Sequence, residues 1–337
     1  MWFLWIGFIL LILLLLALDL GVFHRKAHVV NVREALVWSA VWVTLALLFN
    51  VFIYFGYEHH WLGLGLPNVE PDGHAAAVFF FTGYVLEKSL SVDNIFVIAL
   101  IFSYFRVPAA CQHRILFWGI LGALLMRGAM ILAGAVLIER FHWILYIFGA
   151  FLIVTAAKML SARQEPDPKN NFLVKLASRL LPVTQDFVGP KFVVRVDNRW
   201  TVTPPFLALI AVESADVMFA VDSIPAIFAI TLDPFLVFTS NVFAILGLRS
   251  LFFALAGIMD RFHYLKLSLA VLLALIGVKM LLKDLLHGIP GLTYYTLGAI
   301  TLVLTAGVVA SILRAKRVRA TVGQESTVAS SPHEEVR

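Results

Sequence analysis

The stretch Val212-Glu-Ser-Ala-Asp-Val-Met-Phe-Ala-Val-Asp-Ser-Ile-Pro-Ala-Ile227 places the carboxylates of Glu213, Asp216 and Asp222 inside an otherwise apolar run. The whole chain of 337 residues is 61% hydrophobic and only 14% charged, which leaves more apolar surface than a water-soluble fold can bury. We therefore expect an all-α, polytopic membrane protein. A single cysteine, Cys111, excludes an internal disulfide framework and makes a thiolate metal site implausible.

Nine apolar runs are long enough to cross a bilayer as helices. They cover residues 2–23, 35–57, 75–105, 115–138, 142–160, 204–231, 235–258, 264–282 and 291–313. If the chain changes sides at every helix, the loops on one side carry 19 Lys and Arg residues, whereas those on the other carry only 2. By the positive-inside rule, this asymmetry predicts an outside N-terminus and a cytoplasmic C-terminus.

The predicted helices divide the chain into six segments. We expect two N-terminal helices with an external loop in 1–74, a three-helix unit in 75–160, a cytoplasmic loop in 161–203, a second three-helix unit in 204–283, a C-terminal helix in 284–319 and a disordered cytoplasmic tail in 320–337. Within the cytoplasmic loop, apolar and polar residues alternate on both sides of Asp197-Asn198, which predicts a small β-hairpin.

Short sequence repeats relate the two three-helix units. Glu139-Arg-Phe-His recurs as Asp260-Arg-Phe-His, and Lys158-Met-Leu as Lys279-Met-Leu, both at an offset of 121 residues; Ile120-Leu-Gly recurs as Ile245-Leu-Gly at 125, and Val92-Asp-Asn-Ile as Val221-Asp-Ser-Ile at 129. Because each unit has an odd number of helices, the two units enter the membrane upside down relative to each other. Inverted repeats of this kind are typical of secondary transporters, although a duplicated bundle that serves only as a scaffold is the alternative.

The first unit contains its own acidic stretch, Leu86-Glu-Lys-Ser-Leu-Ser-Val-Asp-Asn-Ile95, with the same six-residue separation between its two acids, Glu87 and Asp93. Six residues turn a regular helix by about 600°, so the two carboxylates of a pair lie about 120° apart around the helix. A straight helix cannot direct both at one point, and Pro225 removes a backbone hydrogen bond beside Asp222. We therefore expect a break in each helix beside Asp93 and beside Asp222.

Carboxylates inside a membrane persist when they are paired, protonated or bound to a cation. Lys88, Arg127 and Arg249 are the available counter-charges, so buried ion pairs that only fix the helices are one interpretation. The five acids outnumber these cations, however, and the surplus predicts an external positive ligand. The candidate metal ligands are Glu87, Asp93, Asn94, Glu213, Asp216, Asp222 and Ser223. Carboxylate, amide and hydroxyl oxygens suit Mn²⁺, Mg²⁺ or Ca²⁺ and would repel an anion such as tellurite.

Three stretches resemble the TerC family of tellurium-resistance type integral membrane proteins, and its alkali-inducible Alx branch in particular. They are the two acidic stretches, extended to Val97 and Ala229, and Thr239-Ser-Asn-Val-Phe-Ala-Ile-Leu-Gly-Leu-Arg249. The resemblance runs from the first helix to about residue 313. It implies a bacterial inner-membrane protein of the LysE exporter superfamily, associated with manganese efflux. The family's intramembrane acids correspond here to Glu87, Asp93, Glu213, Asp216 and Asp222.

Taken together, these observations predict a secondary transporter that exports Mn²⁺ and binds it at the intramembrane carboxylates between the inverted units. Exchange of Mn²⁺ for protons at these carboxylates is one way to drive the export. The alternatives are a non-transporting membrane redox modulator, an assembly or metalation factor, and a tellurite-resistance factor. We expect no catalytic residues, no permanent cofactor and no nucleic-acid partner. The sequence does not distinguish Mn²⁺ from other hard divalent cations, and it gives neither the coupling ion nor the oligomeric state.

Overall fold

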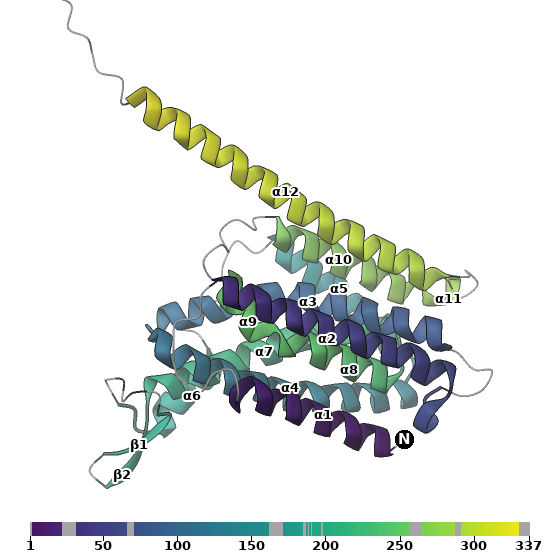
Figure 1. Ribbon diagram of the computed structural model, residues 1–337, viewed down its shortest axis with the longest axis horizontal. Helices are drawn as coiled ribbons and strands as arrows, with labels where there is room; N and C mark the ends of the chain where they lie inside the picture. The colour runs from purple at the N-terminus through teal and green to yellow at the C-terminus, as the bar shows by residue number, and fades with distance from the viewer. Residues whose placement is uncertain are drawn as a thin grey trace, which may run out of the picture.

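A computed structural model of the chain is a bundle of long helices with one small hairpin at its end (Figure 1). The structure describes residues 2–21, 32–65, 71–161, 171–184, 187, 189, 191–196, 198–255, 264–286 and 291–329. The bundle axis lies horizontal in Figure 1, with the hairpin at the left.

The first two helices form one side of the bundle. They are α1 (Trp2–Gly21) and α2 (Val32–Glu58), and a short 3₁₀ turn, Trp61–Gly63, follows α2. Aromatic rings connect them to each other and to the rest of the fold. The ring centroid of Phe8 in α1 lies 5.4 Å from that of Phe49 in α2 and 6.2 Å from that of Phe243. The outer faces of α1 and α2 are apolar and exposed, as expected for helices that contact lipid.

The first three-helix unit consists of α3 (Gly73–Tyr104), α4 (Ala109–Arg140) and α5 (Ile144–Ser161). Asp72 caps α3 by accepting a hydrogen bond from the backbone N–H of Ala75 at 2.7 Å, which satisfies one of the free donors at the helix start. Pro108 precedes α4 in an extended conformation. The missing N–H of proline is harmless at this position, because the first N–H groups of a helix have no partner within the helix.

The loop between the two units contains a helix that the sequence analysis missed, α6 (Phe172–Leu180), capped by Asn171. The predicted hairpin is formed by β1 (Val193–Val196) and β2 (Arg199–Val202), which pair antiparallel. Asn198, in the turn, has a φ of 64°, a left-handed conformation that Asn adopts more readily than most residues.

The second unit consists of α7 (Pro204–Phe228), α8 (Pro234–Leu246), α9 (Leu248–Leu255) and α10 (Leu265–Leu281). α7 and α8 each begin with a proline, whose missing N–H costs nothing at the first helical position. Asp233 caps α8 through the backbone N–H of Phe235 at 2.8 Å and accepts a hydrogen bond from Tyr57 at 2.7 Å. This contact joins the start of α8 to the end of α2.

The helix breaks are not where the sequence analysis placed them. α3 runs without interruption past Asp93, and α7 runs past Asp222 to Phe228 with Pro225 inside it, so both predicted breaks are wrong. The interruption lies instead at Gly247, between α8 and α9. There the Lys88 ammonium donates to the carbonyl of Ala244 at 3.2 Å, and this bond stabilises a carbonyl at the interruption.

The chain ends with a short helix, α11 (Lys283–Leu286), and a long one, α12 (Leu292–Ala329). α12 extends beyond the bundle at the end where the hairpin lies (Figure 1). The sequence predicts a disordered tail from residue 320, whereas the helix continues through residue 329. Residues 320–329 contain no proline to stop a helix that is already formed; residues 330–337 lie outside the described part of the chain.

Each of the nine predicted membrane-spanning ranges contains a helix, and the range 235–258 contains two. Among the described residues, five segments are long and apolar enough to cross a membrane: 32–58, 111–140, 144–161, 234–255 and 292–314. α3 and α7, which carry the intramembrane acids, are not among these five. The structure confirms an all-α membrane protein, while the number of nine spans stays a prediction.

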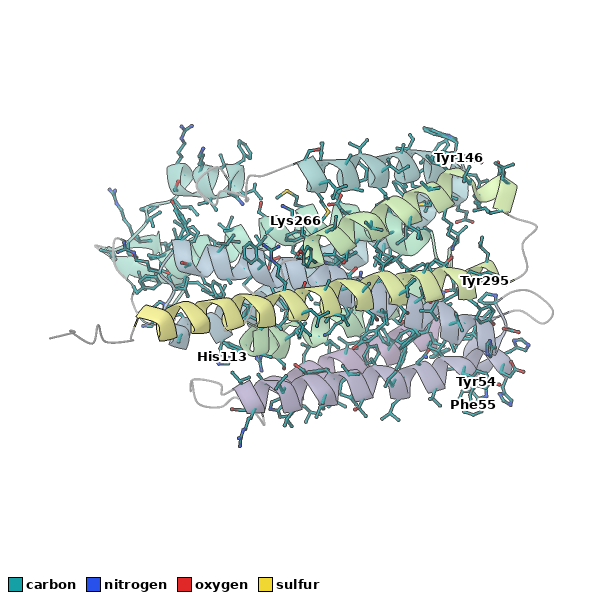
Figure 2. All side chains as sticks on the ribbon, turned by 90° about the horizontal axis from the view of Figure 1, so that it is seen from above. Tyr54, Phe55, His113, Tyr146, Lys266 and Tyr295 are labelled. Atoms are coloured by element: carbon teal, nitrogen blue, oxygen red, sulfur yellow. The ribbon has the colours of Figure 1, made fainter. Side chains whose placement is uncertain are left out.

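Three tyrosines mark one end of the bundle. Tyr54 near the end of α2, Tyr146 near the start of α5 and Tyr295 near the start of α12 lie at one end of the bundle (Figure 2). Lys266, at the start of α10, lies away from that end. Tyrosines gather where a helix leaves the hydrocarbon layer, so this end is suited to one membrane–water boundary.

The two units pack against each other in a reciprocal way. α3 contacts α8, α4 contacts α7, and α5 contacts α10. At the crossing of α5 and α10, a Cβ atom on Gly149 would lie 3.0 Å from the carbonyl oxygen of Gly277, and one on Gly277 would lie 2.7 Å from that of Gly149. At the 121-residue offset, Gly149 of α5 corresponds to Ala270 of α10, and Gly277 of α10 corresponds to Ala156 of α5. Both alanines are buried, so small residues lie at corresponding places on the two helices. An inverted repeat predicts this pattern, but the repeat itself stays a prediction.

The close approach of α5 and α10 makes Gly277 intolerant of a larger residue. We expect Gly277→Ala to lower stability by about 1–3 kcal/mol because the new methyl group overlaps the backbone of α5. Thermal unfolding in detergent, followed by size-exclusion chromatography, measures the loss. Gly298→Ala is the matched control, since nothing lies within 4 Å of a Cβ atom there. Equal unfolding midpoints for the two variants would contradict the assigned crossing.

Candidate functional site

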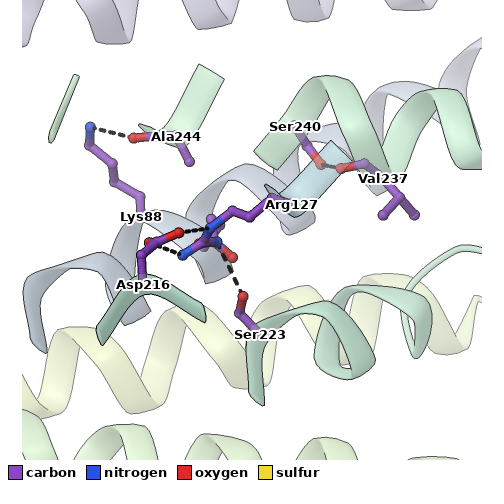
Figure 3. A network of polar contacts seen from close by, with 8 residues as sticks. Lys88, Arg127, Asp216, Ser223, Val237, Ser240 and Ala244 are labelled. Carbon is purple, nitrogen blue, oxygen red and sulfur yellow. Dashed lines mark hydrogen bonds and ion pairs between the residues drawn. The ribbon is translucent and has the colours of Figure 1, made fainter. Parts of the chain in front are cut away.

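Arg127 of α4 lies at the centre of a buried polar cluster between the two units (Figure 3). Its Nη2 donates to Oδ1 of Asp216 at 3.0 Å and its Nε donates to Oδ2 of the same carboxylate at 3.2 Å. Its Nη1 donates to Glu87 and, at 3.2 Å, to the hydroxyl of Ser223. The side chains of Arg127 and Glu87 are 1% and 0% exposed, against 12% for Asp216. A bidentate pair of this kind both fixes geometry and offsets the cost of burying the charges.

The two acids of this cluster occupy corresponding positions in the two units. Glu87 on α3 and Asp216 on α7 are separated by 129 residues, the offset that relates the acidic stretches, and α3 packs against α7. The arginine has no such counterpart. The 125-residue offset that relates the two Ile-Leu-Gly motifs aligns Arg127 with Phe252, a buried residue of α9. One guanidinium therefore serves an acid from each unit.

Three buried oxygens on α3 have no hydrogen-bond partner in the described part of the chain. They belong to Glu87 (Oε2), Ser91 (Oγ) and Asn94 (Oδ1), whose spacing of four and three residues puts them on one face of the helix. Buried polar atoms without a protein partner call for a bound water or ion. This row of oxygens is the strongest indication of a ligand site, and Ser91 was not among the predicted ligands.

A small cavity of about 30 Å³ adjoins the cluster. Its lining is apolar except for Asn94, Asp216 and Arg249. A volume of roughly 10–15 Å³ is enough for one water molecule, so the cavity has room for water or for an ion that has lost most of its hydration shell. A ligand in this cavity could therefore contact the carboxylate of Asp216, which is already paired with Arg127.

Glu213 lies one turn before Asp216 on α7 and contacts the backbone of α4. A Cβ atom added to Gly122 would overlap the Glu213 carboxylate, and Oε2 of Glu213 is buried with no hydrogen-bond partner in the regions the structure describes. The glycine thus makes room for a buried carboxyl group in the contact between α4 and α7.

Asp93 and Asp222 lie apart from the arginine cluster. Asp222 accepts a hydrogen bond from Thr155 of α5 at 3.1 Å and interacts electrostatically with Lys158 on the same helix. Asp93 interacts electrostatically with Lys266 at the start of α10. The positive charge of a lysine on the last helix of the other unit thus acts on each aspartate.

The structure corrects the predicted counter-charges. Arg127 pairs with the acids as expected, but Lys88 donates to the Ala244 carbonyl at the helix interruption (Figure 3). Lys158 and Lys266, which the sequence analysis did not consider, lie near Asp222 and Asp93 instead. The signal that could have identified Lys158 is its place three residues after Thr155 on a predicted helix, but the rotation of that helix is not readable from the chain.

The seven predicted ligands are thus only partly brought together. Glu87, Asp216 and Ser223 meet at Arg127, and Asn94 adjoins them through the cavity. Glu213 lies against Gly122 instead, and Asp93 and Asp222 interact with lysines of other helices. Within the described part of the chain, no group of three His, Cys, Asp or Glu side chains is arranged to hold a metal ion. The arrangement that would complete a metal site requires at least one of these acids to change partners.

Gly122 and Glu213 give a direct test of this packing. We expect Gly122→Ala to lower the thermal midpoint in detergent because the new methyl group displaces the Glu213 carboxylate, at a cost of about 1–3 kcal/mol. Adding Glu213→Ala to that variant should recover most of the loss, since the overlapping group is then absent.

Gly119→Ala is the control on the same helix, where a Cβ atom would only approach a valine methyl at 3.2 Å. A Gly122→Ala loss that the second substitution leaves unchanged would show that Glu213 does not occupy this place.

Comparison with known proteins places these features in a family. Residues 72–319 match the model of the integral membrane protein TerC family. The chain is 48% identical over 314 residues to an uncharacterized membrane protein, STKORF319, of Myxococcus xanthus, and this alignment covers 93% of each protein. It is 48% identical over 290 residues to the putative membrane-bound redox modulator Alx of Escherichia coli K12, and this alignment covers 84% of this chain and 87% of that protein. An uncharacterized membrane protein of Rickettsia bellii is 42% identical over 311 residues, 92% of this chain and 97% of the relative. No solved structure matches the chain.

Proposed function

Because the chain belongs to the TerC family of integral membrane proteins, we propose that it is a secondary transporter that exports Mn²⁺ across the bacterial inner membrane. The cation enters from the cytoplasm, binds between the two three-helix units, and leaves on the outer side as the units move against each other. Protons exchange for it at the same carboxylates.

The observation that carries this proposal is the row of buried oxygens on α3 opposite Asp216. Glu87, Ser91 and Asn94 each have an oxygen without a hydrogen-bond partner within the described residues, and the adjoining cavity reaches Asp216. A set of buried ion pairs that only fixed the helices would leave no such row, because unpaired polar atoms in an apolar surrounding are destabilising.

The kind of oxygen supports a hard divalent cation. Carboxylate, hydroxyl and amide oxygens are preferred by Mn²⁺, Mg²⁺ and Ca²⁺, whereas Zn²⁺ and Cu⁺ favour nitrogen and sulfur ligands. An anion such as tellurite is disfavoured, because the Arg127 guanidinium is already paired with carboxylates on two helices.

A second candidate comes from the name of the E. coli relative, a putative redox modulator. A redox relay within this chain would require paired thiols or a bound redox group, and the chain has a single cysteine. Cys111 is buried and its thiol lies 3.6 Å from the carbonyl oxygen of Gly189. An effect on redox state is better explained as a consequence of altered metal content than as electron transfer by this protein.

Transport of Mn²⁺ by the purified chain in proteoliposomes tests the proposal. We expect Asp216→Asn to reduce flux by about tenfold or more, because a charge-assisted ligand contributes about 1.5–3 kcal/mol. Asp222→Asn should also reduce flux, since Asp222 borders the same contact between the units.

Asp284→Asn is the matched control: this aspartate is exposed on α11 and accepts a hydrogen bond from Tyr146, far along the chain from the cluster. Its flux should equal that of the unaltered protein. Equal flux in all four proteins would exclude transport through these carboxylates.

A further inference from the structure

We propose that Arg127 is an internal competitor of the transported cation, and that its guanidinium occupies the carboxylates of Glu87 and Asp216 whenever the metal ion is absent. The inference rests on the proposed function, and it concerns the step in which the empty carrier returns to the side where it loads.

The guanidinium is held in the way that a bound cation would be held. Its three nitrogens contact oxygens from Glu87, Asp216 and Ser223, which come from two different helices, α3 and α7. The side chain is 1% exposed and is the largest of the fully buried side chains in the described part of the protein. A positive group thus already lies at the point where the acids of the two units meet.

Arginine and metal ion cannot occupy this place together. Both oxygens of Asp216 and one oxygen of Glu87 accept hydrogen bonds from the guanidinium. A divalent cation bound to the same oxygens would lie directly beside a positive charge in surroundings of low dielectric constant, where like charges repel strongly. Metal binding therefore requires Arg127 to leave both carboxylates.

The charges explain why such a competitor is useful. With Arg127 displaced, two carboxylates carry a charge of −2, which one divalent cation balances. Without Arg127 or a metal ion beside them, the two carboxylates would remain unpaired among apolar helices, which has a high free-energy cost. Arg127 reduces it to −1, which a single proton can neutralise. The arginine thus stabilises the empty carrier during its return.

Arg127 belongs to the first unit, and the 125-residue offset aligns it with Phe252 of the second unit. One guanidinium therefore contacts an acid from each unit at once. This asymmetry makes the competitor specific for one cation bound between the units, rather than for one cation in each.

Net transport and exchange separate this role from a purely structural one. Full-length protein in proteoliposomes is measured in two ways: net movement of radioactive Mn²⁺ into metal-free vesicles, and exchange against Mn²⁺ already present on both sides. Net movement needs the empty carrier to return, whereas exchange does not. The proteins compared are the unaltered chain, Arg127→Gln, and Arg140→Gln as a control at the exposed end of α4.

We expect Arg127→Gln to retain exchange and to lose net transport by about tenfold, with tighter apparent Mn²⁺ affinity. If Arg127 holds the site for about nine-tenths of the time, its removal tightens the apparent affinity about tenfold. Arg140→Gln should match the unaltered chain in both measurements. An unchanged ratio of net transport to exchange, or the loss of both in a folded protein, would overturn the proposal.

Arg127→Lys decides the question if Arg127→Gln does not elute as a single folded species. Lysine keeps the charge but cannot make the bidentate contact with Asp216, so the ratio of net transport to exchange should fall below that of the unaltered protein. A ratio equal to that of the unaltered chain would overturn the inference. If the unaltered chain supports neither net transport nor exchange, the proposed function fails, and that outcome differs from all of these.

Discussion

A negative charge buried among apolar helices is stable only beside a positive one, and the contact of Arg127 with Glu87 and Asp216 meets that requirement at the centre of this protein. It joins α3, α4 and α7. Around this contact, the charges of Lys266 and Lys158 act on Asp93 and Asp222, and Gly122 admits Glu213 where α4 meets α7. The result is a core in which most charges are balanced and a few oxygens are not, which is the condition for a cation to enter and to leave.

Much of the architecture could be predicted from the chain because the determining features are local. Apolar runs indicated a helix in every predicted range, and the acidic stretches identified the helices that meet at the centre. Features that depend on the rotation of one helix against another could not be predicted. Lys158 and Lys266 face the aspartates only because of how α5 and α10 are turned, and Ser91 joins the row of oxygens only because α3 is continuous. The break was expected beside Pro225, yet a proline close to a helix end disrupts little, while Gly247 and the Lys88 contact permit the real interruption.

The family relationship and the site chemistry point in compatible directions. The relatives include proteins named as putative redox modulators, whereas this chain has a single cysteine, Cys111, and therefore no pair of thiols. A carrier that changes the amount of a redox-active metal such as manganese would alter redox state indirectly. On this account the two descriptions concern one activity, because the physical step in the membrane is the exchange of a divalent cation for an arginine and a proton at the same carboxylates.

The central claim is tested most directly by anomalous diffraction from crystals of the protein grown with Mn²⁺. The account predicts an anomalous peak between the carboxylates of Glu87 and Asp216, with the Arg127 guanidinium moved away from both. A structure in manganese that shows no peak there, with Arg127 still bound to both acids, would contradict it.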